Sequence, residues 1–130
     1  MKLTELKKLK NKLSKLMVPD WNVTIAFASL DMELANVQPR PDERHAHIEI
    51  SDKLDDIEIP AVVAHELSHL VIFEFETMVM DIINQLPPDI LKYVDSLMHH
   101  LHERAVENIG QSVLRCLEIK SKSKAPGEKK

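Results

Sequence analysis

The chain has 130 residues, of which 44% are hydrophobic and 29% charged, so we expect one globular domain with a core of its own. A single cysteine excludes an internal disulfide, and no apolar stretch approaches the length of a membrane span. Lysines throughout the N-terminal segment exclude the apolar part of a secretory signal peptide. These features together predict a cytoplasmic protein that does not bind a membrane.

The net charge of −4 is unevenly distributed along the chain. Residues 1–16 carry +5 and residues 120–130 carry +4, which leaves −13 for the residues between them. An acidic body disfavours nucleic acid as a partner and suits a metal site. The lysines at both ends most simply favour solubility. The alternative is that the basic C-terminal segment lies in an acidic cleft of the same chain.

The first half of the chain predicts one helix and three strands. Leucines at three- and four-residue steps, with lysines between them, predict an amphipathic helix over residues 2–17. We expect it to pack on the domain rather than on a membrane surface or a partner helix. Alternating apolar and polar residues predict strands over residues 21–27 and 45–51, with a further short strand over 34–38. The prolines in residues 39–43 are expected to end that short strand.

The second half predicts three helical segments. A central apolar helix begins at Pro60, which suits the first helical turn, and gives way near Thr77. A short helix covers residues 78–86 and stops at two prolines. A long helix with an apolar stripe then starts with Asp89 and runs to about Leu117.

These segments predict an α+β fold with an N-terminal helix, a small three-stranded sheet, a central helix and a long C-terminal helix. Residues 120–130 have no hydrophobic face to bury. We therefore expect a single domain over residues 1–119, followed by a flexible basic tail over residues 120–130.

The central helix carries the sequence His65-Glu66-Leu67-Ser68-His69. Histidines four residues apart lie on one face of a helix, so both imidazoles can reach one zinc ion. Glu66 would lie close to that ion and could take a proton from a metal-bound water. Apolar residues surround the motif, so its polar side chains would be buried at a cost that a metal offsets. The alternative is a helix with two surface histidines.

A catalytic zinc ion usually has three protein ligands, so the third must come from another element. Glu103 and Glu107 of the long helix share a face with Gly110. A glycine inside a helix costs about 0.5–1 kcal/mol against alanine, which suggests that another backbone approaches it closely. We infer that this face crosses the central helix and directs Glu103 at the metal, while His102 points elsewhere. The alternative is a solvated acidic stripe.

Two motifs, His-Glu-Leu-Ser-His at residues 65–69 and Glu-Arg-Ala-Val-Glu at residues 103–107, resemble those of the gluzincin class of zincin metallopeptidases. In size and order of elements the chain is most similar to the minigluzincins. The similarity in layout covers roughly residues 20–115, and it implies a minimal zincin domain whose long C-terminal helix carries the third metal ligand.

The resemblance implies that His65, His69 and Glu103 hold a zinc ion. It also implies that Glu66 is the general base and that Glu107 orients a ligand histidine. The implied activity is hydrolysis of a protein or peptide by a zinc-dependent endopeptidase. The alternative is a latent or inactive metallopeptidase-like protein, with a structural zinc or a self-blocked cleft.

Further expectations concern the substrate and its transition state. In zincins an edge strand above the central helix holds the substrate in extended form, so the resemblance implies pairing along His45–Ser51. Tyr93 and His99 are candidates for stabilising the transition state. His45 and His47 lie on one face of their strand and offer an alternative, second metal site for which no third ligand is evident.

Overall fold

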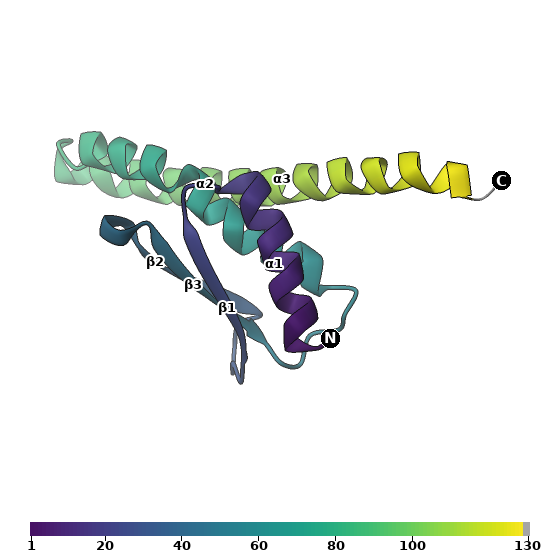
Figure 1. Cartoon of the computed structure of the whole chain (residues 1–130). Helices are drawn as coiled ribbons and strands as arrows, with labels where there is room; N and C mark the ends of the chain where they lie inside the picture. Colours follow the sequence, from purple (N-terminus) through teal and green to yellow (C-terminus); the bar gives the residue numbers. More distant parts are fainter. Residues whose placement is uncertain (129–130) are drawn as a thin grey trace.

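The computed structural model describes the backbone of residues 1–128, and the side chains in that range except those of Glu74 and residues 119–128. Within these residues the fold is α+β, with three α-helices, a short 3-10 helix and one three-stranded mixed sheet (Figure 1). This confirms the predicted class and the small sheet. The elements in chain order are α1 (Leu3–Met17), β1 (Asn22–Ala28), β2 (Ala35–Arg40), η1 (Pro41–Glu43), β3 (His45–Ser51), α2 (Ile59–Ile83) and α3 (Pro88–Glu128).

Strand β3 is the central strand of the sheet. The strand order is β1-β3-β2, with β1 parallel and β2 antiparallel to β3. Buried Ala46, Ile48 and Ile50 alternate along β3 with more exposed polar residues, as the sequence pattern predicted. Because β3 has a neighbour on each side, it offers no free edge, and the expectation that a substrate pairs along His45–Ser51 is wrong. Among the described strands the free edges belong to β1 and β2.

Strand β2 extends further than the sequence predicted. It continues through Pro39 to Arg40, whereas the prolines were expected to end it after Gln38. The edge position explains the difference, since a proline that lacks an N–H is tolerated where the strand has only one neighbour. The 3-10 turn η1 then leads directly into β3.

Helices α1 and α2 pack on the same face of the sheet and enclose the core (Figure 1). Leu6 and Leu13 of α1 are fully buried, so the N-terminal helix packs on the domain as expected. The other core residues come from the end of α1, the sheet and the first half of α2. They are Val18, Val23, Ile25, Ala46, Ile48, Ile50, Ile59, Val63, Ala64, Leu67 and Leu70.

Helix α2 is one continuous helix of 25 residues. The predicted break near Thr77 and the separate helix over residues 78–86 are therefore wrong. The Thr77 hydroxyl donates a hydrogen bond to the carbonyl oxygen of Phe73 at 2.9 Å, so this side chain is satisfied within the helix and does not end it. The chain leaves the helical conformation only just before Pro87 and Pro88.

Helix α3 returns alongside α2 and continues well past it (Figure 1). The predicted helix end near Leu117 is too early, and the backbone over residues 120–128 is helical. Lysine and alanine are good helix formers, and no proline or glycine interrupts the sequence between Gly110 and Pro126. Residues 129–130 of the expected tail lie outside the described residues. Among the helices described, none combines the length and apolar character that crossing a membrane requires.

Candidate metal centre

The His-Glu-Leu-Ser-His motif lies in the half of α2 that packs on the sheet. Leu67 and Ser68 are fully buried, and the Ser68 hydroxyl donates to the carbonyl oxygen of Ala64 at 2.7 Å. His65 and His69 are half-buried. Metal-binding atoms of His65, Glu66 and His69 all lie within 4.8 Å of one another. The helix therefore presents three potential ligand groups from one buried segment.

Helix α3 comes closest to the α2 backbone at Gly110. A Cβ atom at this position would lie 3.4 Å from both the carbonyl carbon of Ala64 and the backbone nitrogen of His65. The inference that this glycine marks a close approach of another backbone is confirmed. Glu103 and Glu107 lie on the same face of α3, two turns and one turn before Gly110 respectively, so the contact carries both carboxylates to the motif.

Glu103 reaches the first histidine of the motif across this helix contact. Its Oε2 atom lies 3.8 Å from Nε2 of His65. Metal-binding atoms of His69, His102 and Glu103 also lie within 4.8 Å of one another. The three residues predicted as zinc ligands, His65, His69 and Glu103, therefore lie near one another, but they belong to two ligand groups that share His69 rather than to one. The structure places a further imidazole, His102, beside them.

Glu107 holds the other side of the His65 ring. Its Oε2 atom lies 2.9 Å from His65 Nδ1, and the Gln111 side-chain amide donates to its Oε1 atom at 3.1 Å. The hydrogen bonds with Gln111 and His65 lower the pKa of the Glu107 carboxyl. A charged carboxylate only accepts hydrogen bonds, so His65 Nδ1 is the donor. Nε2 of His65, which faces Glu103, then keeps its lone pair for a metal ion.

The expectation that His102 points away from the site is wrong. His102 Nε2 lies 2.9 Å from His69 Nδ1, and His102 Nδ1 forms an ion pair with Oε2 of Glu76. The side chains of two adjacent residues of α3, His102 and Glu103, both contact α2. The sequence held a signal for this cluster, since Glu76 follows His69 by two helical turns and so shares its face.

Glu66 is the most deeply buried ionisable side chain of the site, with 8% of its surface exposed. The pKa of the Glu66 carboxyl is raised to about 7, chiefly by burial; His65 opposes the shift, and the nearby carboxylates of Glu103 and Glu33 contribute to it. A cation between the histidines would favour the charged carboxylate. Two imidazoles and carboxylates are also the donors that zinc prefers, so the residues present fit a zinc ion.

The motif opens into a cleft between α2 and the edge strand β2. Two cavities of about 390 and 450 Å³ share Ala35, His65 and Glu66 among their lining residues. The larger one is also lined by Val37 and Pro39 of β2. The strand that lines this cleft beside the histidines is therefore β2, an edge strand, rather than His45–Ser51.

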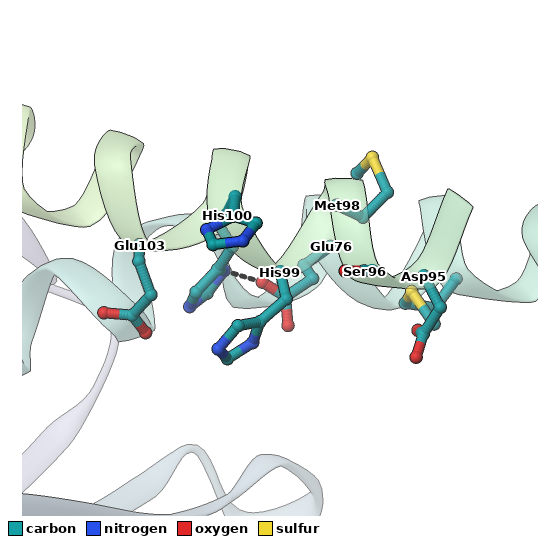
Figure 2. Close-up of a pocket in the computed structure, with 9 residues that line it drawn as sticks. Glu76, Asp95, Ser96, Met98, His99, His100 and Glu103 are labelled. Carbon is teal, nitrogen blue, oxygen red and sulfur yellow. Dashed lines mark ion pairs between the residues drawn. The ribbon is translucent and has the colours of Figure 1, made fainter. Parts of the chain in front are cut away.

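The two candidates for transition-state stabilisation are placed differently. His99 lines a cavity of about 500 Å³ between α2 and α3 together with Glu76, His102 and Glu103 (Figure 2). Tyr93 is 84% exposed and lines a surface pocket that none of the motif residues reach. The structure brings His99 beside the site and does not bring Tyr93 there.

The second site considered at His45 and His47 gains no further ligand. His47 Nδ1 lies 2.7 Å from the hydroxyl of Thr24. Among the described side chains, neither histidine belongs to a group of three potential metal ligands. The residues that could hold a metal are therefore those contributed by α2 and α3.

Comparisons of the chain with protein-family models, with curated proteins and with solved structures give no match. The function must therefore be inferred from the residues and their arrangement.

Proposed function

We propose that the protein is a zinc-dependent endopeptidase of the zincin type. The observation that carries this proposal is the convergence of His65 and His69 from α2 with Glu103 from α3, beside the buried carboxyl of Glu66. Two imidazoles and one carboxylate form a ligand set of catalytic zinc sites, which keep a fourth position open for water or substrate. The hydrogen bond between His65 and Glu107 supports this assignment, because a neutral His65 that donates from Nδ1 keeps the lone pair of Nε2 for the metal.

Glu66 is the proposed general base. When bound, a zinc ion polarises the peptide carbonyl and lowers the pKa of a coordinated water to about 7. Glu66 accepts the proton of the attacking water and passes it to the leaving nitrogen. Burial, which raises the pKa of its carboxyl to about 7 in the metal-free protein, supports this role, because the transfer requires that Glu66 can hold a proton.

The proposed substrate is a protein or peptide bound in extended form. The free edge of β2 lines the cleft opposite His65 and Glu66, so a peptide could pair with β2 by strand addition and lie across the motif. His99 lies close enough to the site to remain a candidate for stabilising the transition state.

The test measures zinc content and hydrolysis of casein in the same preparations. We expect wild type to bind one zinc ion and to cleave casein, and Glu66→Ala to keep the zinc while losing cleavage. Glu118→Ala, which removes an exposed carboxylate on α3, is the control and should match wild type. Absence of zinc from wild type, or equal cleavage by Glu66→Ala, would contradict the proposal.

The third ligand needs a separate test because His102 lies in the same ligand group as His69 and Glu103. Glu103→Ala should lower the zinc content. Full stoichiometry in Glu103→Ala, combined with loss of zinc in His102→Ala, would reassign the third ligand to His102.

A second candidate function is a structural zinc site without hydrolysis. The contact between His102 and His69 favours it, since an additional imidazole could close the position that a catalytic zinc leaves open. Stoichiometric zinc with no cleavage by wild type would select this function.

The self-blocked form of the cleft has less support. At about 1.5 Å per residue, helical residues 120–128 lie about 25 Å or more beyond Glu103 along α3. Deletion of residues 119–130 should then leave cleavage of casein unchanged, whereas a self-blocked cleft requires the deletion to raise it.

A further inference from the structure

We propose that Glu76 and His102 are positioning residues that hold His69 through a chain of hydrogen bonds, so that its Nε2 atom faces the metal site. The role of His69 as a ligand rests on the proposed function. The orientation and protonation of its ring can be measured without a metal.

The chain has two contacts and crosses between the helices twice. Nδ1 of His69 on α2 lies 2.9 Å from Nε2 of His102 on α3. Nδ1 of His102 contacts Oε2 of Glu76, which lies on α2 two turns after His69. The dashed line that ends at Glu76 in Figure 2 marks this contact, at the wall of the cavity between the two helices. The two helices are therefore joined through polar groups next to the candidate metal centre.

The order of donors and acceptors follows from the carboxylate at the end of the chain. The Glu76 carboxylate only accepts, so His102 Nδ1 carries a proton. Both of these atoms are buried, and no other hydrogen-bond partner is found for either among the described residues. In a neutral His102, Nε2 is then an acceptor, so the proton in the second contact belongs to His69 Nδ1. His69 Nε2 keeps its lone pair.

This arrangement gives the two motif histidines the same tautomer by different means. His65 donates from Nδ1 directly to the Glu107 carboxylate, whereas His69 donates to a carboxylate through the intervening ring of His102. Partners of this kind fix the tautomer and ring orientation of a ligand, and their removal typically costs about 10–100-fold in metal affinity. If His102 were protonated on both nitrogens, its Nε2 would donate to Nδ1 of His69, and the proton of His69 would then lie on Nε2.

The experiment determines the histidine tautomers by ¹⁵N NMR on metal-free protein and the dissociation constant for zinc on the same variants. In wild type we expect His69 to carry its proton on Nδ1. His102→Ala should remove this preference and weaken zinc binding about 10–100-fold, and Glu76→Gln should act in the same direction. His102→Gln should restore much of both properties, because its side-chain oxygen can accept the proton of His69 Nδ1. His99→Ala is the matched control, since His99 lines the same cavity outside the chain, and it should leave both measurements unchanged.

The possible outcomes separate this inference from the proposed function. A proton on Nε2 of His69 in wild type, or unchanged zinc affinity in His102→Ala, would overturn the inference. Complete loss of zinc in His102→Ala without rescue by His102→Gln would also overturn it, because His102 would then be a ligand. A protein that shows the expected tautomers and affinities but does not cleave casein would support the positioning role and contradict the peptidase. Circular dichroism of His102→Gln shows that the comparison is made on folded protein.

Discussion

One part of the paired helices α2 and α3 packs on the core of the domain, and the other part extends beyond it. The sheet-side half, which we define as residues 59–70 and 102–117, packs on the core. The distal half, residues 71–83 and 88–101, extends beyond it and contacts the rest of the domain near its start, where the Phe73 ring lies edge-on to Trp21. Among the described side chains of the distal half, only Ile83 is buried. The exposed apolar side chains of that half are Val71, Phe75, Met78, Ile82, Ile90, Tyr93, Leu97 and Leu101.

This difference matters because the candidate metal centre lies at the boundary between the halves. His65, His69 and Glu103 belong to the sheet-side half, while Glu76 is in the distal half. A metal site requires ligands whose positions are fixed by packed surroundings, and only the sheet-side half supplies such packing. We therefore expect stability and ligand geometry to depend on the sheet-side half and local opening to begin in the distal half.

The largest expected effect tests this division of stability. Leu67 is fully buried, and Leu67→Ala should lower the free energy of unfolding by about 3–5 kcal/mol. Ile82 is 62% exposed, so Ile82→Ala should change it by less than about 0.5 kcal/mol. Urea denaturation of the two variants measures both values. Similar losses in the two variants would show that the distal half is as well packed in solution as the sheet-side half.

The next effect concerns the buried carboxyl of Glu66 in metal-free protein. The pKa of its carboxyl is about 7 in the folded protein, against an ordinary value of 4.5, so the folded state binds more protons than the unfolded state between these pH values. Wild type should therefore lose stability as pH rises from about 4.5 to 7. Glu66→Gln does not titrate, and its stability relative to wild type should increase by roughly 3 kcal/mol over that window.

Urea denaturation of both proteins with a chelator at pH 4, 6 and 8 measures this difference. For each protein the free energy of unfolding is plotted against pH, and one plot is subtracted from the other. The subtraction removes the titration of groups that remain in both proteins, including His65, Glu103 and Glu33, which face Glu66. A difference independent of pH would mean that Glu66 is charged at little cost. Saturating zinc should reduce the difference, because a bound cation favours the charged carboxylate.

The features predicted correctly from the sequence depend on local patterns. Alternation over residues 45–51 gave the bounds of β3, and the four-residue spacing of His65 and His69 placed both rings on one face of a helix. Gly110 indicated a close helix contact, and a Cβ atom at this position would indeed touch the α2 backbone. In each case the pattern and its physical cause lie within a few residues of the chain.

The features predicted wrongly depend on contacts between distant segments. The alternation in β3 does not encode how many strands flank it, so its central position was missed. Thr77 was expected to end the helix, but its hydroxyl donates to the carbonyl oxygen of Phe73 one turn earlier, and the helix continues. The direction of His102 is set by how α3 crosses α2, which the periodicity of α3 alone does not determine.

A smaller effect tests the helix contact that brings Glu103 to the motif. Gly110→Val adds a branched side chain where even a Cβ atom would lie 3.4 Å from the α2 backbone, so it should cost about 1–3 kcal/mol of stability. It should also weaken zinc binding, because α3 must move away from His65. Asn108→Val, at an exposed position of α3, is the control for helix propensity. Equal losses of stability and zinc affinity in the two variants would show that the close contact contributes nothing.

The smallest expected effect is at Tyr93 and tests whether the distal half takes part in catalysis. Tyr93 is 84% exposed and lines a pocket without any motif residue, so Tyr93→Phe should change casein cleavage by less than about twofold. Loss of a group that donates to the developing oxyanion would instead lower kcat by about 10²–10³-fold. A loss of that size in Tyr93→Phe, with unchanged zinc content, would mean that the distal half rearranges during turnover to bring Tyr93 to the substrate. The sheet-side half would then hold the metal, and the distal half would complete the active site.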